Sequence, residues 1–116
     1  MKVLIVEDEK LAADHLSGLI RKYDNTIEII GRLDSVTKGV EWFSGNHHPD
    51  LAFFDIQLAD GLSFEIFEQA DVQCPVIFTT AFNEYALRAF KVNSVDYLLK
   101  PIDFDELRAA MEKFQR

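Results

Sequence analysis

Short runs of apolar residues recur along the chain, separated by longer segments in which apolar and polar residues mix. The runs span residues 3–6, 27–30, 51–54, 76–78 and 95–99. Their length predicts β-strands. The third run is apolar at four consecutive positions and is followed at once by Asp55. Because it lacks polar alternation, we expect this strand to be buried on both faces, as in a parallel sheet.

The intervening segments carry apolar residues at every third or fourth position, which predicts amphipathic helices. These segments are 11–20, 36–43, 62–67, 86–90 and 103–114. Ser35 is the expected N-cap of the second helix. The pair Asp60-Gly61 is a turn signal that should lead into the third helix. Asp103 and Glu106 have capping-box spacing at the start of the last one.

Five strands in strict alternation with five helices predict an α/β domain, with a parallel sheet covered by helices on both faces. The second and fifth strands contain the polar residues Glu28 and Asp96, so they suit the edges of the sheet. The expected architecture is therefore a doubly wound, flavodoxin-like sheet with strand order 2-1-3-4-5. The length of 116 residues and the lack of any linker or repeat fit one domain over residues 1–116.

The composition narrows the possible functions. The formal net charge of −8 argues against direct binding of nucleic acid, whose phosphates are held mainly by Lys and Arg. The single cysteine, Cys74, cannot form an internal disulfide. No apolar segment reaches the length that spans a membrane, so we expect a cytoplasmic protein with no membrane partner.

Polar side chains that bind metal and phosphate follow several of the predicted strands. The first strand is followed by Glu7-Asp8-Glu9 and the third by Asp55, and these two strands are expected neighbours. Ligands of open α/β sheets bind at the carboxyl ends of the strands. Close carboxylates repel one another unless a cation lies among them. We therefore expect Mg²⁺ on Glu7, Asp8 and Asp55, with the backbone carbonyl of Gln57 as a further ligand.

Two further strand ends add to this candidate site. The fourth strand ends in Thr79-Thr80, which places a hydroxyl beside it, and the fifth ends in Leu99-Lys100-Pro101, which places an ammonium there. The combination is more specific than any single residue, since a lone aspartate or lysine at a strand end is usually a turn or loop residue. Asp55 is thus the candidate for a reactive, phosphate-accepting carboxylate.

Four segments of the chain resemble the response-regulator receiver domain of bacterial two-component signalling. They are Val6-Glu7-Asp8-Glu9, Asp50-Leu51-Ala52-Phe53-Phe54-Asp55, Thr79-Thr80-Ala81 and Tyr97-Leu98-Leu99-Lys100-Pro101. The resemblance extends from end to end and implies the CheY-like form of the fold. It also implies that Glu7 and Asp8 serve the metal, that Asp55 accepts a phosphoryl group and that Thr80 and Lys100 contact this group. The Lys100-Pro101 bond would be cis.

The segment 81–101 is similar to receivers of the LytTR (LytR/AlgR-like) subfamily, whose regulators carry a mostly β DNA-binding domain after the receiver. That domain is absent here, so the chain is either an excised N-terminal part of a longer regulator or a receiver that acts alone. The resemblance favours excision, with DNA reached only through the missing domain. Two departures from the usual receiver pattern stand out. Glu7 replaces an aspartate, and the loop after Asp55 lacks a proline. If the Gln57 contact is made by a backbone carbonyl, its side chain matters little.

The resemblance implies a signalling function. A sensor histidine kinase would donate the phosphoryl group in a Mg²⁺-dependent reaction, and transcription would be the output. Apart from this self-phosphorylation and its reversal, no enzymatic activity is expected. Thr80 and Tyr97 would move as a switch. The fourth helix, fifth strand and fifth helix would then form a symmetric dimer. The charged and aromatic residues of that face are Tyr85, Arg88, Lys91 and Arg108, among acids such as Asp96 and Glu112.

Other functions fit less well. A Mg²⁺-dependent phosphohydrolase or a Toprim-like catalytic domain needs an Asp-x-Asp pair, which Asp55-Ile56-Gln57 breaks. A flavodoxin-like FMN binder needs a loop rich in Ser, Thr and Gly, where this chain has acids. A pseudo-receiver that only binds partners would not need the intact acid, hydroxyl and lysine set. The pair His47-His48 is expected in a solvated loop. His15 is expected on the apolar stripe of the first helix as a boundary residue, with a contact to a kinase as the alternative.

Overall fold

The computed structural model describes residues 1–45, 48–92 and 94–116, and His47 lies outside them. The elements are β1 (Lys2–Val6), α1 (Lys10–Tyr23), β2 (Glu28–Leu33), α2 (Val36–Gly45), β3 (Leu51–Asp55), β4 (Gln57–Leu58), β5 (Gly61–Leu62), α3 (Phe64–Gln69), β6 (Val76–Thr80), α4 (Ala86–Lys91), β7 (Asp96–Leu99) and α5 (Phe104–Phe114). A 3₁₀ turn, Asn83–Tyr85, leads into α4. None of the helices described is long and apolar enough to cross a membrane.

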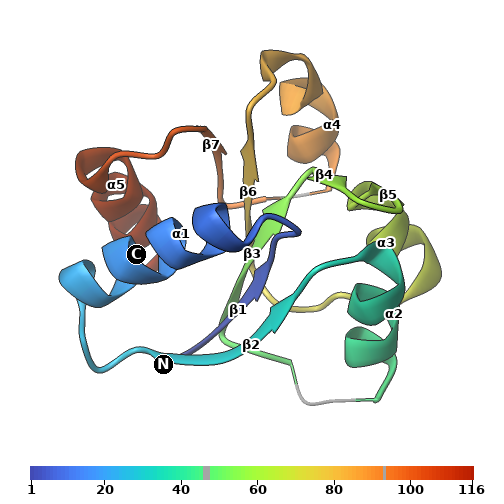
Figure 1. Ribbon diagram of the computed structural model, residues 1–116, viewed down its shortest axis with the longest axis horizontal. Helices are drawn as coiled ribbons and strands as arrows, with labels where there is room; N and C mark the ends of the chain where they lie inside the picture. Colours follow the sequence, from blue (N-terminus) through green and yellow to red (C-terminus); the bar gives the residue numbers. More distant parts are fainter. Residues whose placement is uncertain (46–47, 93) are drawn as a thin grey trace.

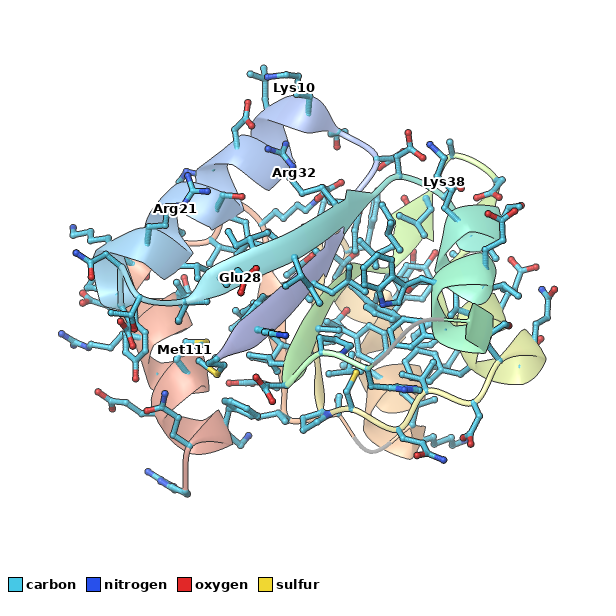
Figure 2. The ribbon with its side chains drawn as sticks, turned by 90° about the horizontal axis from the view of Figure 1, so that it is seen from below. Lys10, Arg21, Glu28, Arg32, Lys38 and Met111 are labelled. Atoms are coloured by element: carbon cyan, nitrogen blue, oxygen red, sulfur yellow. The ribbon has the colours of Figure 1, made fainter. Side chains whose placement is uncertain are left out.

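The main sheet is parallel, and its strands lie in the order β2-β1-β3-β6-β7. Since β6 and β7 are the fourth and fifth strands of the sequence pattern, this order confirms the predicted 2-1-3-4-5 arrangement. The polar strands β2 and β7 form the two edges, as expected from Glu28 and Asp96. The exposed side chains of Glu28 and Arg32 follow the outer strand β2, and Arg32 reaches α1 to pair with Asp14 (Figure 2).

Helices cover both faces of this sheet, with α1 and α5 on one side and α2, α3 and α4 on the other (Figure 1). Alternate residues of β1 serve the two cores because successive side chains of a strand point to opposite faces. Val3 and Ile5 pack with residues of α1 and α5, whereas Leu4 and Val6 pack with residues of α2 and α3. β3 is buried at every position, as its apolar run predicts.

The segment after β3 differs from the prediction. Leu62 was expected in the third helix, but this helix begins at Phe64, and Leu62 lies in β5. The strands β4 and β5 form a two-residue antiparallel hairpin. Gly61 has φ +145°, and a Cβ there would lie 2.2 Å from Glu65 Oε2, so the Asp60-Gly61 turn closes a hairpin and does not start a helix. Strands of two residues are too short to show the alternation by which a sequence predicts them.

The predicted helix caps form as expected at two sites. Ser35 Oγ accepts a hydrogen bond from the Lys38 N–H (3.1 Å) before α2. Asp103 Oδ1 accepts one from the Glu106 N–H (2.8 Å) before α5. The second cap, Asp103, lies three residues after Lys100 and fixes the start of α5 at Phe104, which places the β7–α5 connection close to the carboxyl edge of the sheet.

Candidate functional site: an acid cluster with one lysine

The parallel register of the sheet brings the predicted site residues to one edge. Val6 pairs with Phe54, so Glu7 emerges beside the end of β3. Asp55 pairs with Thr79, and Thr80 pairs with Leu99. The chain therefore leaves the four strands β1, β3, β6 and β7 at the same level. Side chains from parts of the sequence far from one another meet there.

Lys100 is the cation of this cluster. Its Nζ lies 2.5 Å from Glu7 Oε1 and 3.3 Å from Asp55 Oδ2. The side chains of the two acids are only 4% and 6% exposed, and that of Lys100 is 19% exposed. The second oxygen of Glu7 accepts the Glu9 N–H at 3.2 Å. One ammonium thus serves two buried carboxylates, which leaves the group negative overall.

The pKa of Asp55 is raised to about 7. Burial is the largest cause, and the hydrogen bond and charge of Glu7 raise this pKa by more than Lys100 lowers it. Burial also raises the pKa of the more exposed Asp8, with Glu7 again contributing. At Glu7, burial is the largest effect and acts upward. The hydrogen bonds from Lys100, Asp55 and the Glu9 N–H outweigh it, so the pKa of Glu7 is lowered. The contacts with Glu7 and Asp55 likewise raise the pKa of Lys100 against its burial.

The cluster offers three carboxyl groups to the single ammonium of Lys100. Glu7, Asp8 and Asp55 each have a carboxylate oxygen within 4.8 Å of those of the other two. Oxygens on one Mg²⁺ lie at about 2.0–2.1 Å from it, so they are up to about 4 Å apart. The donor set therefore suits a hard divalent cation with only a small rearrangement. Carboxylates and carbonyls are the ligands that Mg²⁺ prefers.

A cavity of about 280 Å³ lies beside these acids, and Asp8, Asp55, Gln57, Thr80 and Lys100 are among its lining residues. The buried Thr80 accepts the Phe82 N–H on Oγ1 at 3.1 Å. The Gln57 side chain donates to the Tyr85 hydroxyl (2.9 Å), so it turns away toward the 3₁₀ turn. The peptide bond between Lys100 and Pro101 is cis. The five strand-end residues singled out in the sequence are thus neighbours in space.

Tyr97 does not line this cavity. Its ring is partly buried against the core on the α4 side, and its hydroxyl donates to the Phe82 carbonyl at 2.5 Å. Partial burial raises the pKa of Tyr97, and the nearby Glu84 adds to the rise. Phe82 therefore contacts Thr80 through its N–H and Tyr97 through its C=O. No pattern in the sequence indicates this connection between Thr80 and Tyr97 through the backbone of Phe82.

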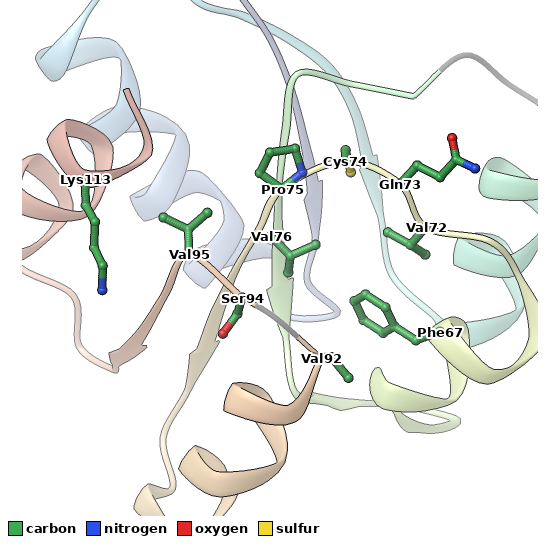
Figure 3. A pocket seen from close by; sticks show the side chains of 10 residues that line it. All are labelled: Phe67, Val72, Gln73, Cys74, Pro75, Val76, Val92, Ser94, Val95 and Lys113. Carbon is green, nitrogen blue, oxygen red and sulfur yellow. The ribbon is translucent and has the colours of Figure 1, made fainter. Parts of the chain in front are cut away.

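The largest cavity described lies elsewhere. It has a volume of about 580 Å³, and Phe67, Cys74, Val76, Val92 and Lys113 are among its lining residues (Figure 3). It lies at the amino end of β6, opposite the acids, and burial raises the pKa of the Cys74 thiol to about 11. It offers no cluster of titratable groups comparable to the acid site.

The other residues considered from the sequence have structural contacts. His48 lies against Phe43 and hydrogen-bonds the Asp71 carbonyl (2.9 Å), so it faces neither the acids nor a metal cluster among the described residues. Arg88 stacks on Phe64, 4.5 Å from the ring centroid. Arg108 pairs with Asp105 at 3.3 Å. The α4-β7-α5 face therefore carries both signs of charge.

Comparison with known proteins decides the family. The family model described as "Response regulator receiver domain" matches residues 3–112. The chain belongs to this family. "Sensory transduction protein LytT" of Bacillus anthracis is 39% identical over all of this chain and 48% of its own length. "Transcriptional regulatory protein BtsR" of Escherichia coli K12 is 36% identical, again over 48% of its length.

The solved structures give the same result. The response regulatory domain of protein mrkE from Klebsiella pneumoniae superposes on this receiver with a TM-score of 0.84 and 34% sequence identity, covering 99% of this chain and 95% of that one. The resemblance to LytTR receivers is confirmed by the LytT relatives. The receiver spans about half the length of these curated relatives.

Two polar contacts of this receiver have no signal in the sequence. The Asp60 carboxylate accepts the backbone N–H groups of Val36 (2.7 Å) and Thr37 (3.1 Å), so it caps α2 from the distant hairpin. His15 Nε2 lies 2.8 Å from the Ile102 carbonyl oxygen. Both contacts join segments far apart in sequence, and no local spacing indicates them.

Proposed function

We propose that Asp55 of this receiver accepts a phosphoryl group from a sensor histidine kinase in a Mg²⁺-dependent reaction. The observation that carries the proposal is the single ammonium of Lys100 shared by two buried carboxylates, Glu7 and Asp55. A buried group of this kind is costly unless further positive charge joins it. A structural ion pair would need only one acid for one lysine.

The proposed reaction is a displacement at phosphorus. An Asp55 Oδ attacks the phosphorus of a phosphohistidine, a P–O bond forms, and the P–N bond breaks. The leaving imidazole nitrogen keeps the electron pair and takes a proton from solvent. Lys100 stabilises the negative charge on the phosphoryl oxygens, and Thr80 donates its hydroxyl to one of them. Catalysis of this kind rests on positioning and charge, with little covalent work for the protein.

Glu7, Asp8, Asp55 and the Gln57 carbonyl would hold Mg²⁺, and the bound ion would supply positive charge toward the phosphoryl oxygens. The 4.8 Å limit on the distances between the carboxylate oxygens supports this ligand set for the three acids. Label transfer that persists in excess chelator would contradict the metal requirement.

Phosphorylation would change how two copies of the chain associate. An aspartyl phosphate adds negative charge and acceptor oxygens, so Thr80 would turn toward it and give up the Phe82 N–H. Phe82 would then shift, and with it Tyr97, on the α4-β7-α5 face, where two copies of the chain would form a symmetric dimer. A LytTR-type DNA-binding domain, following this receiver in a longer regulator, would then act on transcription. The length and names of the relatives support this part.

Intact mass spectrometry tests the proposal directly. The chain is incubated with acetyl phosphate and Mg²⁺, and wild type is compared with Asp55→Asn. We expect wild type to gain the mass of one phosphoryl group and the variant to gain none. A wild-type chain that stays unmodified would be a pseudo-receiver. Continuous release of phosphate from esters would instead support a phosphohydrolase.

A further inference from the structure

His15 makes a contact that the site described above does not use. Its Nε2 lies 2.8 Å from the carbonyl oxygen of Ile102, 87 residues away. A carbonyl oxygen can only accept, so this ring nitrogen must carry the proton and donate it. The contact joins α1, the helix that follows the acids of β1, to the connection between β7 and α5.

That connection holds Lys100. On the β7 side the backbone is fixed because the Lys100 N–H donates to the Thr80 carbonyl at 2.7 Å. On the other side Pro101 has no N–H to donate, and the next residue, Ile102, is tied by its buried side chain and by the hydrogen bond from His15. The hydrogen bond from His15 is thus a polar contact that holds the backbone on the carboxyl side of Lys100.

The His15–Ile102 hydrogen bond and the acid cluster lie beside the same cavity. A cavity of about 380 Å³ is lined by Glu7, His15, Lys100 and Ile102, together with apolar residues of α1. The ammonium of Lys100 sits at the end of a flexible four-carbon chain. Its place between Glu7 and Asp55 therefore depends on how firmly the backbone at its base is held. A displacement of about 1 Å of a catalytic group can cost up to about a hundredfold in rate.

We propose that His15 is a positioning residue: by donating to the Ile102 carbonyl it holds the Lys100 ammonium at Glu7 and Asp55. Its use in phosphoryl transfer rests on the function proposed above, whereas the placement of Lys100 does not. The role needs only a hydrogen-bond donor at the Nε2 position. A ring without a donor should fail, and a side chain with an amide donor should succeed.

The experiment compares His15→Phe, which keeps the ring and loses the donor, with His15→Gln, which keeps a donor of similar reach. The matched control is Tyr23→Phe, which removes another hydrogen bond between α1 and the C-terminal end, from Tyr23 to Gln115 (3.2 Å), far from the acids. Phosphorylation by acetyl phosphate at saturating Mg²⁺ is followed by intact mass. We expect the maximal rate of His15→Phe to fall about tenfold, with His15→Gln and Tyr23→Phe within about twofold of wild type.

A second readout needs no phosphorylation. The side-chain NMR signals of Lys100 are recorded for each variant in metal-free buffer. We expect them to shift in His15→Phe, to return in His15→Gln and to stay in place in Tyr23→Phe. If wild type is not phosphorylated but the signals behave in this way, the proposed function fails and the positioning role stands. Unchanged Lys100 signals in His15→Phe overturn the positioning role. Where wild type is phosphorylated, a rate in His15→Phe equal to that of wild type overturns it as well.

Discussion

Lys100 and Glu7, 93 residues apart in sequence, form an ion pair of 2.5 Å inside the carboxyl edge of the sheet. Lys100 Nζ is farther from Asp55, at 3.3 Å. The ammonium therefore neutralises Glu7 more completely than Asp55, the acid that is expected to react. This unequal sharing is consistent with the opposite pKa directions of the two carboxyls, lowered at Glu7 and raised at Asp55.

Removal of the ammonium should destabilise the fold. Lys100→Met keeps most of the side-chain volume but leaves Glu7 and Asp55 buried without a cation, which costs about 2–4 kcal/mol of unfolding free energy at pH 8. Urea unfolding in the presence of a chelator measures this cost. The control is Lys10→Met, since Lys10 pairs with Asp14 on the surface and its side chain is 83% exposed. Equal stabilities for Lys100→Met and Lys10→Met would contradict the buried pair.

The ionised Asp55 carboxylate should lower the free energy of unfolding in the absence of metal. Its pKa is about 7 in the folded protein against an ordinary value of 3.8, so between these values the folded chain binds more protons than the unfolded one. Stability must then fall as the pH rises from about 4 to 7. Asp55→Asn removes this cost. We expect the variant to exceed wild type at pH 8 by about 1–3 kcal/mol.

The pH series provides the check on Asp55→Asn. In chelator, the gap between variant and wild type should be largest above pH 7 and should narrow as the pH falls from about 7 toward 4, because Glu7, Asp8 and Lys100 then face a protonated Asp55. Added Mg²⁺ should stabilise wild type more than the variant, since the ion binds the folded acids. An Asp55→Asn variant that is less stable than wild type at pH 8 without metal would show that Lys100 outweighs burial and Glu7.

The strands, the helices and most of the site could be predicted from the sequence, because buried runs and strand ends are local signals. Asp55 and Lys100 could be predicted because each directly follows a strand-like run of the sequence, and the parallel order then brings them together. The hairpin of β4 and β5 was missed because two residues cannot show a period. The contacts of His15 and Asp60 depend on where distant backbone groups lie, and only the folded chain determines this.

Tyr97 tests the connection between the acid site and the outer face. Its hydroxyl donates to the Phe82 carbonyl in the unphosphorylated structure, so Tyr97→Phe removes a bond of the resting state. One such bond contributes about 0.5–1.5 kcal/mol, which would raise the dimer fraction of unphosphorylated protein about 2–10-fold. Sedimentation equilibrium measures this fraction, with Tyr23→Phe as the control. Unchanged basal association would mean that the bond persists in both states.

Asp60 should stabilise α2 from outside that helix. Its carboxylate accepts the Val36 and Thr37 N–H groups at the positive end of the helix dipole. These hydrogen bonds, first that of Val36, lower the pKa of Asp60 below 3.8. A lowered pKa contributes stability that is present above 3.8 and is lost as the pH falls through the folded value. Asp60→Asn should therefore lower Tm by several degrees at pH 7.

The same measurement at low pH identifies the cause. As the pH falls from 3.8 through the lowered folded pKa of Asp60, the carboxylate takes up a proton and the Tm difference between wild type and Asp60→Asn should close. Asp34→Asn is the matched control, since Asp34 lies near the same helix start but pairs with Lys38 at 3.0 Å on the exposed surface. We expect it to leave Tm nearly unchanged at both pH values. A Tm difference for Asp60→Asn that does not shrink between pH 7 and pH 3 would attribute the effect to hairpin geometry, because a carboxylate that caps a helix loses its advantage as it is protonated.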